Sequence, residues 1–346
     1  LVANTTGANN VAIGTSALDA NTTADNNTAV GKNAGGANTT GRIDAFGADT
    51  LQANTTGNGN AAFGATALNA TTTGNYNTAM GSGLSGIYGA LQTNTTGSSN
   101  TAFGNQALAQ NTTASNNTAV GKDALSANTT GAANTAMGAG ALDNNTTADN
   151  NTAVGYAAMD ANTTGSENVA VGRLALQTNT TASNNTALGN AALLVNTTGA
   201  SNTAVGSAAL IANTTGELNT AVGASALVSL TTADANTAVG QGSGQDITEG
   251  ASNTLIGRDA GDTITTGSNN TAVGRDADRI TSTGVQNTML GSLARNTHGD
   301  NNRANVIGYN VAGDQDYTTL GVGTSDIRAA HGNVTWATVS DERYKK

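Results

Sequence analysis

Short segments with alternating polar and apolar residues recur along the chain at a fixed spacing. In residues 202–206 (NTAVG) the side chains alternate with a period of two, which predicts a β-strand. The glycine that ends this segment returns at every seventeenth position from Gly14 to Gly308, apart from spacings of 16 before Gly47 and 23 before Gly104. A period kept over most of the chain predicts a repeat architecture in which successive units stack.

The length of the repeat indicates which architecture this is. Helix–turn–helix repeats need about 34 residues, and strand–helix repeats need about 20 or more. Asn, Thr, Gly and Asp lie between the predicted strands and favour turns, whereas Val, Ile, Phe and Thr occupy the strands. We therefore predict an all-β fold, a parallel β-solenoid (β-roll) with coils of about 17 residues, each with two short strands and two corners.

Alternation within the strand suggests which face is interior. In residues 26–31 (NNTAVG), Thr28 and Val30 share one face of the strand and Ala29 lies on the other. We assign the Val/Ile face to the coil interior and the Ala face to the outside. The interior should also take the leucine of the Ala-Leu pair after each strand, as at Leu18, Leu125 and Leu210. Stacked coils would then align Val30, Val120, Val154 and Val205.

A single coil of this kind has too small a core to fold alone. Two large apolar side chains stabilise a coil by less than the ordering of its backbone costs. Stability must therefore come from hydrogen bonds between stacked coils and from burial of further faces against other chains. This reasoning favours a homo-oligomer.

The polar corner of the repeat occurs in two versions. In one, NTT is followed by glycine, as at Gly131. In the other it is followed by alanine, as at Ala114, and an asparagine stands two residues later, as at Asn116. Glycine and asparagine both tolerate the left-handed backbone conformation. We therefore predict that the left-handed residue moves by two positions between the versions.

Charge and composition change along the chain. Nine of the 13 lysines and arginines follow residue 240, together with the only histidines, His298 and His331, and the only tryptophan, Trp336. The repeat register persists to Gly308 and then breaks. We divide the chain into a regular solenoid shaft (1–240), more charged solenoid coils (241–308), a β-rich neck (309–339) and a C-terminal segment (340–346).

One repeat carries six additional residues. They lie within residues 81–92, which also hold Leu84, Ile87 and Tyr88, unusual bulk for this chain. A surface bulge without a role is one interpretation. The other is a contact site, and on that interpretation these three side chains are the candidate ligand-contact residues.

Composition argues against several classes of function. The net charge is −10 and no basic stripe is present, which argues against nucleic-acid binding. No apolar run approaches the roughly 18 residues of a membrane span, so we expect no membrane insertion of this sequence. Without cysteine, and with only two histidines, a disulfide is excluded and a zinc site is improbable.

Two short acidic turns are the segments closest to a metal site. Residues 300–302 and 313–316 offer few carboxylates, whereas calcium takes about six to eight oxygen ligands. We expect these segments to be solvated turns, and we expect no metal site and no cofactor. The chain opens at Leu1 in the middle of a repeat, as a fragment of a longer protein would.

The segment SDERYKK at residues 340–346 resembles the start of the endosialidase-type intramolecular chaperone domain of phage tail spikes and fibres. Residues 320–339 resemble the connector that precedes this domain. In that family the chaperone drives trimerisation of the fibre and then cleaves itself off. The resemblance implies Ser340 as nucleophile and Lys345 as base, a role that requires a lowered lysine pKa. The chain stops at Lys346, so the body of the chaperone is missing from this sequence.

The strands are also similar to the head repeats of trimeric autotransporter adhesins, which are left-handed parallel β-rolls that form homotrimers. Residues 10–14 (NVAIG) and 168–172 (NVAVG) carry this resemblance. The adhesin coils are shorter than the coils of this chain. The resemblance implies a β-roll and a homotrimer, and it leaves the bound partner open.

We therefore expect a structural or adhesive trimeric fibre shaft that presents a host- or surface-binding end. Its owner would be a phage, with the fibre on the virion tail, or a bacterium, with an extracellular adhesin on the cell surface. The partners would be further copies of the chain and a host-cell or surface receptor, such as a glycan. We expect no enzyme activity beyond a single self-cleavage at Ser340.

Two alternatives stay open. A polysaccharide-degrading tail spike needs paired carboxylates on a sugar-binding surface, and residues 1–240 show no such pair in sequence. A monomeric ice- or ligand-binding solenoid would use rows of threonine on a flat face. The threonine pairs of this chain fall in Gly/Asn corners rather than in mid-strand.

Overall fold

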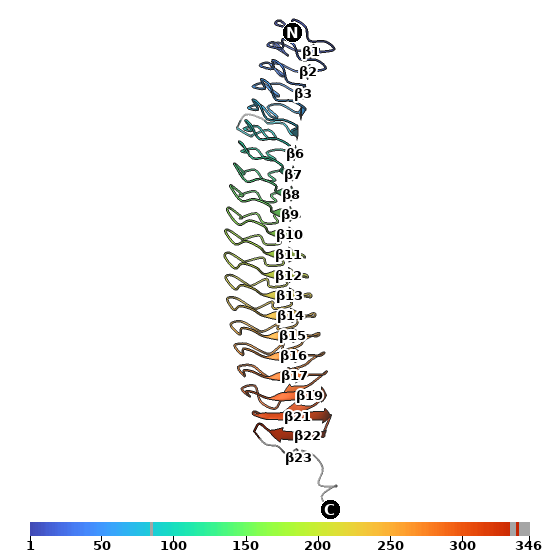
Figure 1. Ribbon diagram of the computed structural model, residues 1–346, viewed down its shortest axis with the longest axis vertical. Helices are drawn as coiled ribbons and strands as arrows, with labels where there is room; N and C mark the ends of the chain where they lie inside the picture. Colours follow the sequence, from blue (N-terminus) through green and yellow to red (C-terminus); the bar gives the residue numbers. More distant parts are fainter. Residues whose placement is uncertain (84–85, 333–336, 339–346) are drawn as a thin grey trace, which may run out of the picture. The chain divides into compact units, whose positions relative to one another are not determined.

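Within each of its two units the chain folds as stacked coils, and each regular coil contributes one strand to a parallel ladder (Figure 1). The computed structural model describes residues 1–83, 86–332 and 337–338. Every regular element in that part of the chain is a β-strand, and it contains no helix. Two compact units are present, Leu1–Thr181 and Ala182–Lys346. The predicted all-β parallel solenoid with coils of about 17 residues is confirmed in each unit.

In the described residues of the first unit (1–83 and 86–181), ten short strands pair in parallel, each with its neighbour in sequence. Pairing keeps the repeat register, because Thr118, Ala119 and Val120 face Thr135, Ala136 and Met137. The strands are β1 (Val11–Ile13), β2 (Thr28–Val30), β3 (Ile43–Phe46), β4 (Asn60–Phe63), β5 (Thr78–Met80), β6 (Thr101–Phe103), β7 (Thr118–Val120), β8 (Thr135–Met137), β9 (Thr152–Val154) and β10 (Val169–Val171).

The second unit has the same pattern and ends in a hairpin. Strands β11 to β17, β19 and β21 form a parallel ladder, whereas β21–β22 and β22–β23 pair antiparallel and β18 pairs with β20. The strands are β11 (Thr186–Leu188), β12 (Thr203–Val205), β13 (Thr220–Val222), β14 (Thr237–Val239), β15 (Thr254–Ile256), β16 (Thr271–Val273), β17 (Thr288–Leu290), β18 (Arg295–Asn296), β19 (Asn305–Tyr309), β20 (Ala312–Gly313), β21 (Tyr317–Val322), β22 (Ser325–Ala330) and β23 (Ala337–Thr338).

Each regular coil has one strand, and the prediction of two strands per coil is wrong. The half of the coil that follows the strand-end glycine is a series of turns. Two of its residues take the left-handed conformation, as Asp123 (φ 59°) and Leu125 (φ 51°) do in the coil after β7. Left-handed residues at alternate positions break strand geometry, so the Ala-Leu pair forms no second β-strand. Backbone bonds still link this half of successive coils, as from the Leu125 N–H to the Ala141 carbonyl at 3.0 Å.

The assignment of strand faces from sequence is also wrong. The column itself is confirmed, since Val30, Val120 and Val154 occupy equivalent ladder positions, but these valines lie on the outer face. Ala119 is fully buried, whereas Val120 is 36% exposed. The predicted interior leucines are correctly placed, because Leu125 and its equivalents are fully buried. Alanine is the strand residue that fits this interior, since leucine and asparagine side chains fill the remaining space.

Core volume is conserved where the repeat lacks its leucine. Glycine occupies the leucine position at Gly35 and Gly261. A Cβ added at Gly35 would lie 2.5 Å from Ile43 Cδ1, and one added at Gly261 would lie 2.7 Å from Leu255 Cδ2. The lost leucine is therefore replaced by a larger residue on a neighbouring strand, as close packing of interiors requires.

The corner asparagine of the NTT motif forms a buried ladder. Asn128 Nδ2 donates to Asn111 Oδ1 at 2.9 Å and to the Gly131 carbonyl at 2.9 Å, and Asn128 Oδ1 accepts from Asn145 Nδ2 at 3.0 Å. These side chains are fully buried. Each amide therefore closes its own corner and binds the coils on both sides. The asparagine of NTT thus belongs to the core, whereas the second threonine, such as Thr130, is exposed.

The asparagine that precedes the strand forms a second buried ladder. Asn134 Oδ1 accepts the backbone N–H of Asn151 at 2.9 Å, while Asn134 Nδ2 donates to the Ala148 carbonyl at 2.8 Å. An equivalent bond is present in the second unit, where Asn219 Oδ1 accepts from the Asn236 backbone at 2.9 Å. These buried amides are thus used between coils, which is the condition for placing polar side chains in a thin core.

The hypothesis that the left-handed corner residue moves between the two repeat versions is wrong. Asn116 does have positive φ (64°), but Ala133, the equivalent residue after a glycine corner, also has positive φ (56°). Gly131 itself lies outside the left-handed region. The left-handed residue therefore keeps one position in both versions.

Candidate functional site

The outer face of the strands carries a column of apolar side chains in each unit. Val120 is 36% exposed and Met137 is 45% exposed, although both stand in regular strands. In the first unit the column is Ile13, Val30, Phe46, Phe63, Met80, Phe103, Val120, Met137, Val154 and Val171. In the second unit it is Leu188, Val205, Val222, Val239, Ile256, Val273, Leu290 and Ile307. Exposed apolar surface of this extent is typical of interaction sites.

A second column on the same face consists mostly of threonine. Thr118 and Thr135 stand two residues before Val120 and Met137, so their side chains point to the same side of the sheet. The strand threonines therefore lie on a flat face, whereas the threonine pairs of the NTT motif lie in the corners, as expected from sequence. Asp44 is the charged exception in the first unit, since no other residue of strands β1 to β10 carries a charge.

All three phenylalanines of the chain belong to the apolar column of the first unit. Phe46 and Phe63 stack with ring centroids 4.9 Å apart and an interplanar angle of 3°. Phe103 lies on β6 and is 41% exposed. Bulk in this column is therefore unevenly distributed within the first unit.

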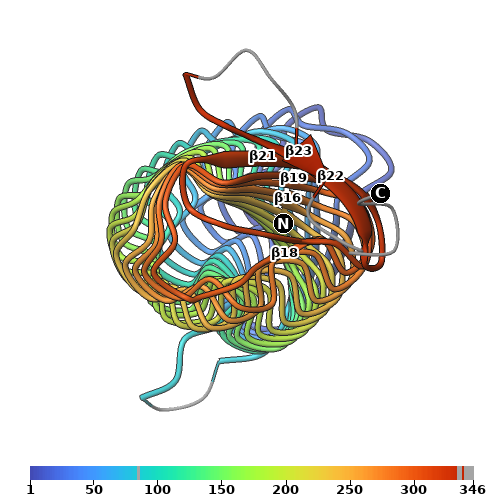
Figure 2. The same cartoon turned by 90° about the horizontal axis from the view of Figure 1, so that it is seen from below.

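The six extra residues, interpreted from sequence as either a surface bulge or a contact site, belong to a side loop that leaves the ladder intact. Strand β5 still pairs in register with β6 across the insertion. The loop projects away from the coils (Figure 2), with Ile87 42% and Tyr88 45% exposed. Gln92 Oε1 anchors its base by accepting from the Gly89 N–H at 2.7 Å. Leu84, the third predicted contact residue, lies outside the described residues.

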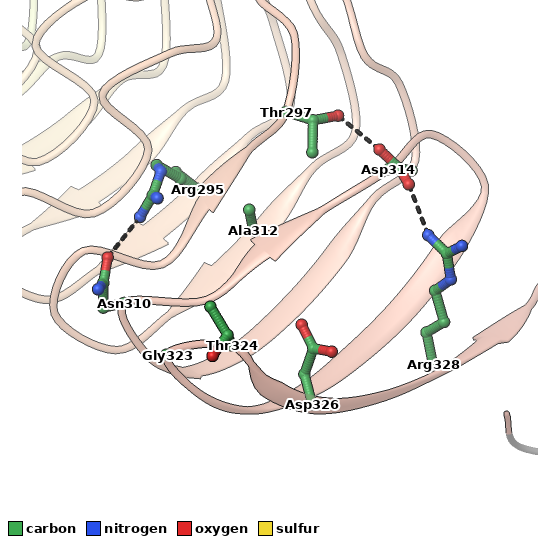
Figure 3. Close-up of a pocket in the computed structure, with 9 residues that line it drawn as sticks. All are labelled: Arg295, Thr297, Asn310, Ala312, Asp314, Gly323, Thr324, Asp326 and Arg328. Carbon is green, nitrogen blue, oxygen red and sulfur yellow. Dashed lines mark hydrogen bonds and ion pairs between the residues drawn. The ribbon is translucent and has the colours of Figure 1, made fainter. Parts of the chain in front are cut away.

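A cleft of about 370 Å³ lies near the end of the second unit (Figure 3). Asp314 accepts from Thr297 Oγ1 at 2.6 Å and from Arg328 at 2.7 Å, and Arg295 donates to Asn310 Oδ1 at 2.7 Å. Its lining residues are Arg295, Thr297, Asn310, Ala312, Asp314, Gly323, Thr324, Asp326 and Arg328.

Polar side chains of β22 that line this cleft cover the end of the solenoid interior. Arg328 pairs with the buried Thr319 on β21, so Arg328 and Asp326 lie on the same face of the sheet as Thr319. Ile327 lies on the other face and is 40% exposed. Burial raises the pKa of Asp326, and Arg328 partly offsets this effect. Polar closure of a terminal coil keeps a repeat protein soluble, so the arrangement serves as a cap.

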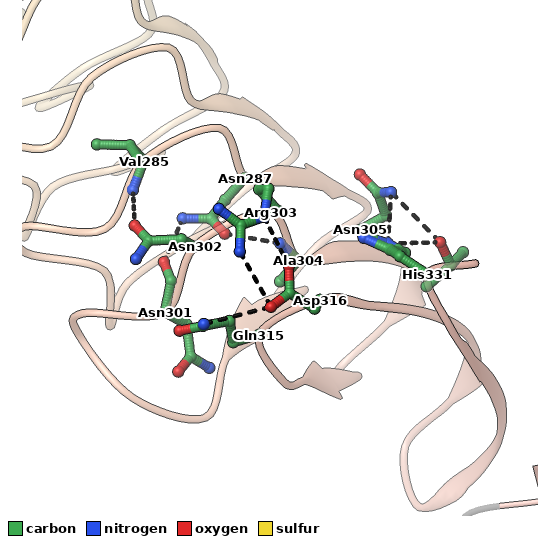
Figure 4. Close-up of polar contacts among 11 residues, drawn as sticks. Val285, Asn287, Asn301, Asn302, Arg303, Ala304, Asn305, Gln315, Asp316 and His331 are labelled. Atoms are coloured by element: carbon green, nitrogen blue, oxygen red, sulfur yellow. Dashed lines mark hydrogen bonds and ion pairs between the residues drawn. The ribbon is translucent and has the colours of Figure 1, made fainter. Parts of the chain in front are cut away.

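A polar network on the last coils includes Asp316 of the acidic turn at residues 313–316 (Figure 4). Arg303 binds Asp316 through two bonds of 2.6 and 3.1 Å, and this contact lowers the pKa of Asp316. His331 Nε2 lies 3.3 Å from both Asn305 Nδ2 and Thr318 Oγ1. The carboxylates of residues 313–316 are thus paired with arginines, and the described residues contain no group of three side chains suited to a metal ion.

Three carboxylates that are distant in sequence gather in the first unit. Burial, together with the nearby Asp123 and Asp160, raises the pKa of Asp143 to about 6. A cavity of about 370 Å³ beside them is lined by Lys122, Asp123, Tyr156 and Asp160, among others. The sequence of residues 1–240 shows no such pair, because it is the stacking of successive coils that brings these acids close together.

A fully buried carboxyl, that of Asp278, interrupts the core of the second unit. Asp278 occupies the position of the repeat leucine and is fully buried. Its Oδ1 accepts from Thr281 Oγ1 at 2.5 Å, and Thr281 Oγ1 accepts from Asn296 Nδ2 at 2.6 Å. Asp278 Oδ2 has no partner in the described structure. Burial raises the pKa of Asp278 to about 6, and Asp262 adds to this effect.

This carboxyl makes the stability of the second unit depend on pH. Because the folded pKa of about 6 exceeds the ordinary value of 3.8, stability falls as pH rises from about 4 to 6 and stays lower above. We expect Asp278→Asn to raise the free energy of unfolding at pH 7 by about 2–3 kcal/mol and to remove most of this slope. Urea titrations at pH 4.5 and 7 measure the free energy of unfolding of both proteins. Asp300→Asn, at an exposed position, is the control. A pH slope unchanged by Asp278→Asn would contradict the assignment.

The predicted self-cleavage residues, Ser340 and Lys345, lie outside the described residues. The buried asparagine ladders and Asp278 were missed at the level of sequence. The signal for the ladders was the recurrence of asparagine at two fixed positions of the repeat, and the signal for Asp278 was a carboxyl in the leucine position.

No family model, curated protein or solved structure matches the chain. Among the described residues, no helix has the length and apolar character needed to span a membrane.

Proposed function

We propose that the chain is the shaft of a homotrimeric fibre that presents a host- or surface-binding end, on a phage tail or as a bacterial surface adhesin. The observation that carries the proposal is the apolar column on the outer face of each unit, with side chains such as Val120 and Met137 left 36–45% exposed. A contiguous apolar face of this kind needs a cover.

A further copy of the chain is the cover that fits this face best. In a parallel trimer around an axis along the ladder, each rung meets the same rung of its partners. Identical side chains can meet without electrostatic cost only where they are uncharged, and the apolar column is uncharged at every rung. Burying the exposed part of one such side chain contributes about 1 kcal/mol, and the contributions accumulate over successive rungs.

Charge placed in the column is expected to dissociate the trimer without unfolding the chain. We expect a mass three times 33.8 kDa for the wild-type protein and a single-chain mass for Val120→Asp at micromolar concentration. Three carboxylates buried at one rung would raise the dissociation constant by about a hundredfold or more.

The matched control is Thr130→Asp, which places the same charge in an exposed corner of the same unit. It should leave both the mass and the thermal unfolding unchanged. Light scattering on the three proteins decides the outcome, and a single-chain mass for the wild-type protein would refute the trimer.

The adhesive part of the proposal rests on the side loop. Ile87 and Tyr88 present two large exposed side chains on a loop whose base is fixed, an arrangement suited to a receptor such as a glycan. Self-cleavage with Ser340 as nucleophile and Lys345 as base belongs to the same proposal.

A polysaccharide-degrading spike is favoured by one observation, the group Asp123, Asp143 and Asp160 beside Tyr156. A raised carboxyl pKa next to other carboxylates is the arrangement that glycoside hydrolysis uses. Release of reducing sugar from bacterial polysaccharide, abolished by Asp143→Asn, would establish this activity in place of a purely structural role.

An ice-binding solenoid is favoured by the outward threonine column, for example Thr118 and Thr135 on adjacent rungs. Regularly spaced hydroxyls and methyls on a flat sheet can order water. Thermal hysteresis in a freezing assay, lost in Thr118→Lys, would support this alternative, and it requires the strand face to be free of partner chains.

A further inference from the structure

We propose that the uneven bulk of the apolar column in the first unit fixes the axial register between copies of the chain. The inference rests on the proposed homotrimer and adds how its chains find one alignment. The residues that carry it are Phe46, Phe63, Met80, Phe103 and Met137.

A trimer built from repeats has a register problem. Many rungs are nearly identical, such as Thr118-Ala119-Val120 on β7 and Thr152-Ala153-Val154 on β9. A chain that slid by one rung would meet look-alike partners and lose the contacts of only one end rung. Symmetric repeats therefore need a feature that penalises the shifted alignments.

The two units differ in how well they can supply this feature. The column of the second unit is aliphatic throughout, from Leu188 to Ile307. The column of the first unit changes size from rung to rung, in the order Ile, Val, Phe, Phe, Met, Phe, Val, Met, Val, Val. No shift by one or two rungs superimposes this order on itself.

Mismatched side-chain sizes make the shifted alignments less stable than the in-register alignment. In register, the three Phe63 side chains meet one another, and each stacks on Phe46 of its own chain. After a slip of two rungs, Phe103 of one chain would meet Phe63 of another, while Phe63 of the first chain would meet Val30. Where the spacing between chains suits three large side chains, a small one leaves a cavity, and where it suits three small ones, a large one overfills the space; each mismatch costs about 1–3 kcal/mol.

The neighbouring column constrains how the faces meet. Asp44 stands two residues before Phe46, in the threonine column. Three copies of Asp44 would repel one another if they met at the axis. The apolar column must therefore lie nearest the axis, with the threonine column and Asp44 toward solvent at the rim.

Disulfide trapping tests the register directly, because the chain contains no cysteine. Chains with Val120→Cys and chains with Met137→Cys are mixed, refolded and oxidised. Adjacent rungs are offset by about 4.8 Å along the axis, so in-register trimers favour like-with-like cross-links, 120 with 120 and 137 with 137.

The register variant combines Phe46→Val, Phe63→Val, Met80→Val and Phe103→Val. We expect it to raise the proportion of mixed 120–137 cross-links at least threefold. The control variant combines Leu188→Val, Ile256→Val, Leu290→Val and Ile307→Val, which removes bulk from the second unit and should leave the proportion unchanged.

The outcomes separate this inference from the proposed trimer. A single-chain mass with no cross-links would refute the trimer itself. A trimer mass with unchanged like-with-like cross-links in the register variant would overturn the inference and leave the trimer standing. A variant that fails to fold is recognised by its circular dichroism, and Phe103→Val alone then provides the milder test.

Discussion

Replacing Gly138 with alanine is expected to lower the free energy of unfolding of the first unit by about 3–5 kcal/mol. Gly138 directly follows strand β8 and has φ +138°, a backbone conformation that residues with a side chain rarely adopt. A Cβ at this position would lie 2.4 Å from the carbonyl oxygen of Gly155 in the next coil. The backbone cannot move away from the added Cβ without breaking the hydrogen bonds of the ladder. The cost of the unfavourable φ and the cost of the steric overlap therefore add together. Urea denaturation followed by circular dichroism measures the loss.

The control for this prediction is two residues away. Gly140 also has positive φ (+67°), but a Cβ added there meets no atom within 4 Å. Equivalent positions in neighbouring coils hold Asp123 and Ala157 at φ 59° and 50°. Gly140→Ala should therefore change stability by less than about 1 kcal/mol. Equal losses for the two substitutions would show that close stacking of the strand-end glycines is not what holds the coils.

Replacing Asn145 with alanine is expected to cost about 3 kcal/mol of stability. The side chain is fully buried and makes three hydrogen bonds: Nδ2 donates to Asn128 Oδ1 at 3.0 Å and to the Ala148 carbonyl at 3.1 Å, and Oδ1 accepts from Asn162 Nδ2 at 2.9 Å. Alanine removes one partner from buried polar groups of three coils and leaves Asn128 Oδ1 with none of its side-chain bonds. The cost therefore exceeds that of the lost bonds alone.

Asn144 provides a matched comparison because it is the adjacent residue of the same type. It is exposed, and it donates one bond of 3.0 Å to the Asp160 carbonyl. Asn144→Ala should lower stability by about 0.5 kcal/mol. If the two alanine variants unfold at the same urea concentration, the asparagine ladder contributes little and the account of the core is wrong.

The stacking register was predictable from sequence, and the inside of the coil was not. The regular return of the strand-end glycine already placed Thr118, Ala119 and Val120 opposite Thr135, Ala136 and Met137. Hydrophobicity alone then put valine inside and alanine outside. The opposite holds because the interior is thin and is shared with a leucine and two asparagines from each coil.

Comparison of the repeats with one another contained the missing signal. The residue after the strand alanine varies among Val, Phe, Met, Leu and Ile, whereas the strand centre is alanine in most coils. A position that accepts such different volumes is not tightly packed within the coil. The role of the buried asparagines was missed because asparagine is also common in turns. Its amide both donates and accepts hydrogen bonds, which is what a buried ladder requires.

Grouped charges depend on stacking and were invisible to a linear scan. Asp123, Asp143 and Asp160 are far apart in sequence, yet stacking makes them neighbours. Asp278 is conspicuous only once its position is known to belong to leucine. The side loop at Ile87 and Tyr88 was predictable because a change in spacing must leave the ladder as a bulge.

The most direct test of one strand layer per coil is the distance between pairs of spin labels in the first unit. Cysteines introduced at exposed corner threonines, Thr56, Thr96, Thr130 and Thr164, carry the labels, and dilution with unlabelled chains removes contacts between copies. Thr56–Thr130 and Thr96–Thr164 each span four coils, so both distances should be about 19 Å despite their different sequence separations. Thr56–Thr164 spans six coils and should give about 29 Å. Distances that follow residue number instead of coil number would contradict the solenoid.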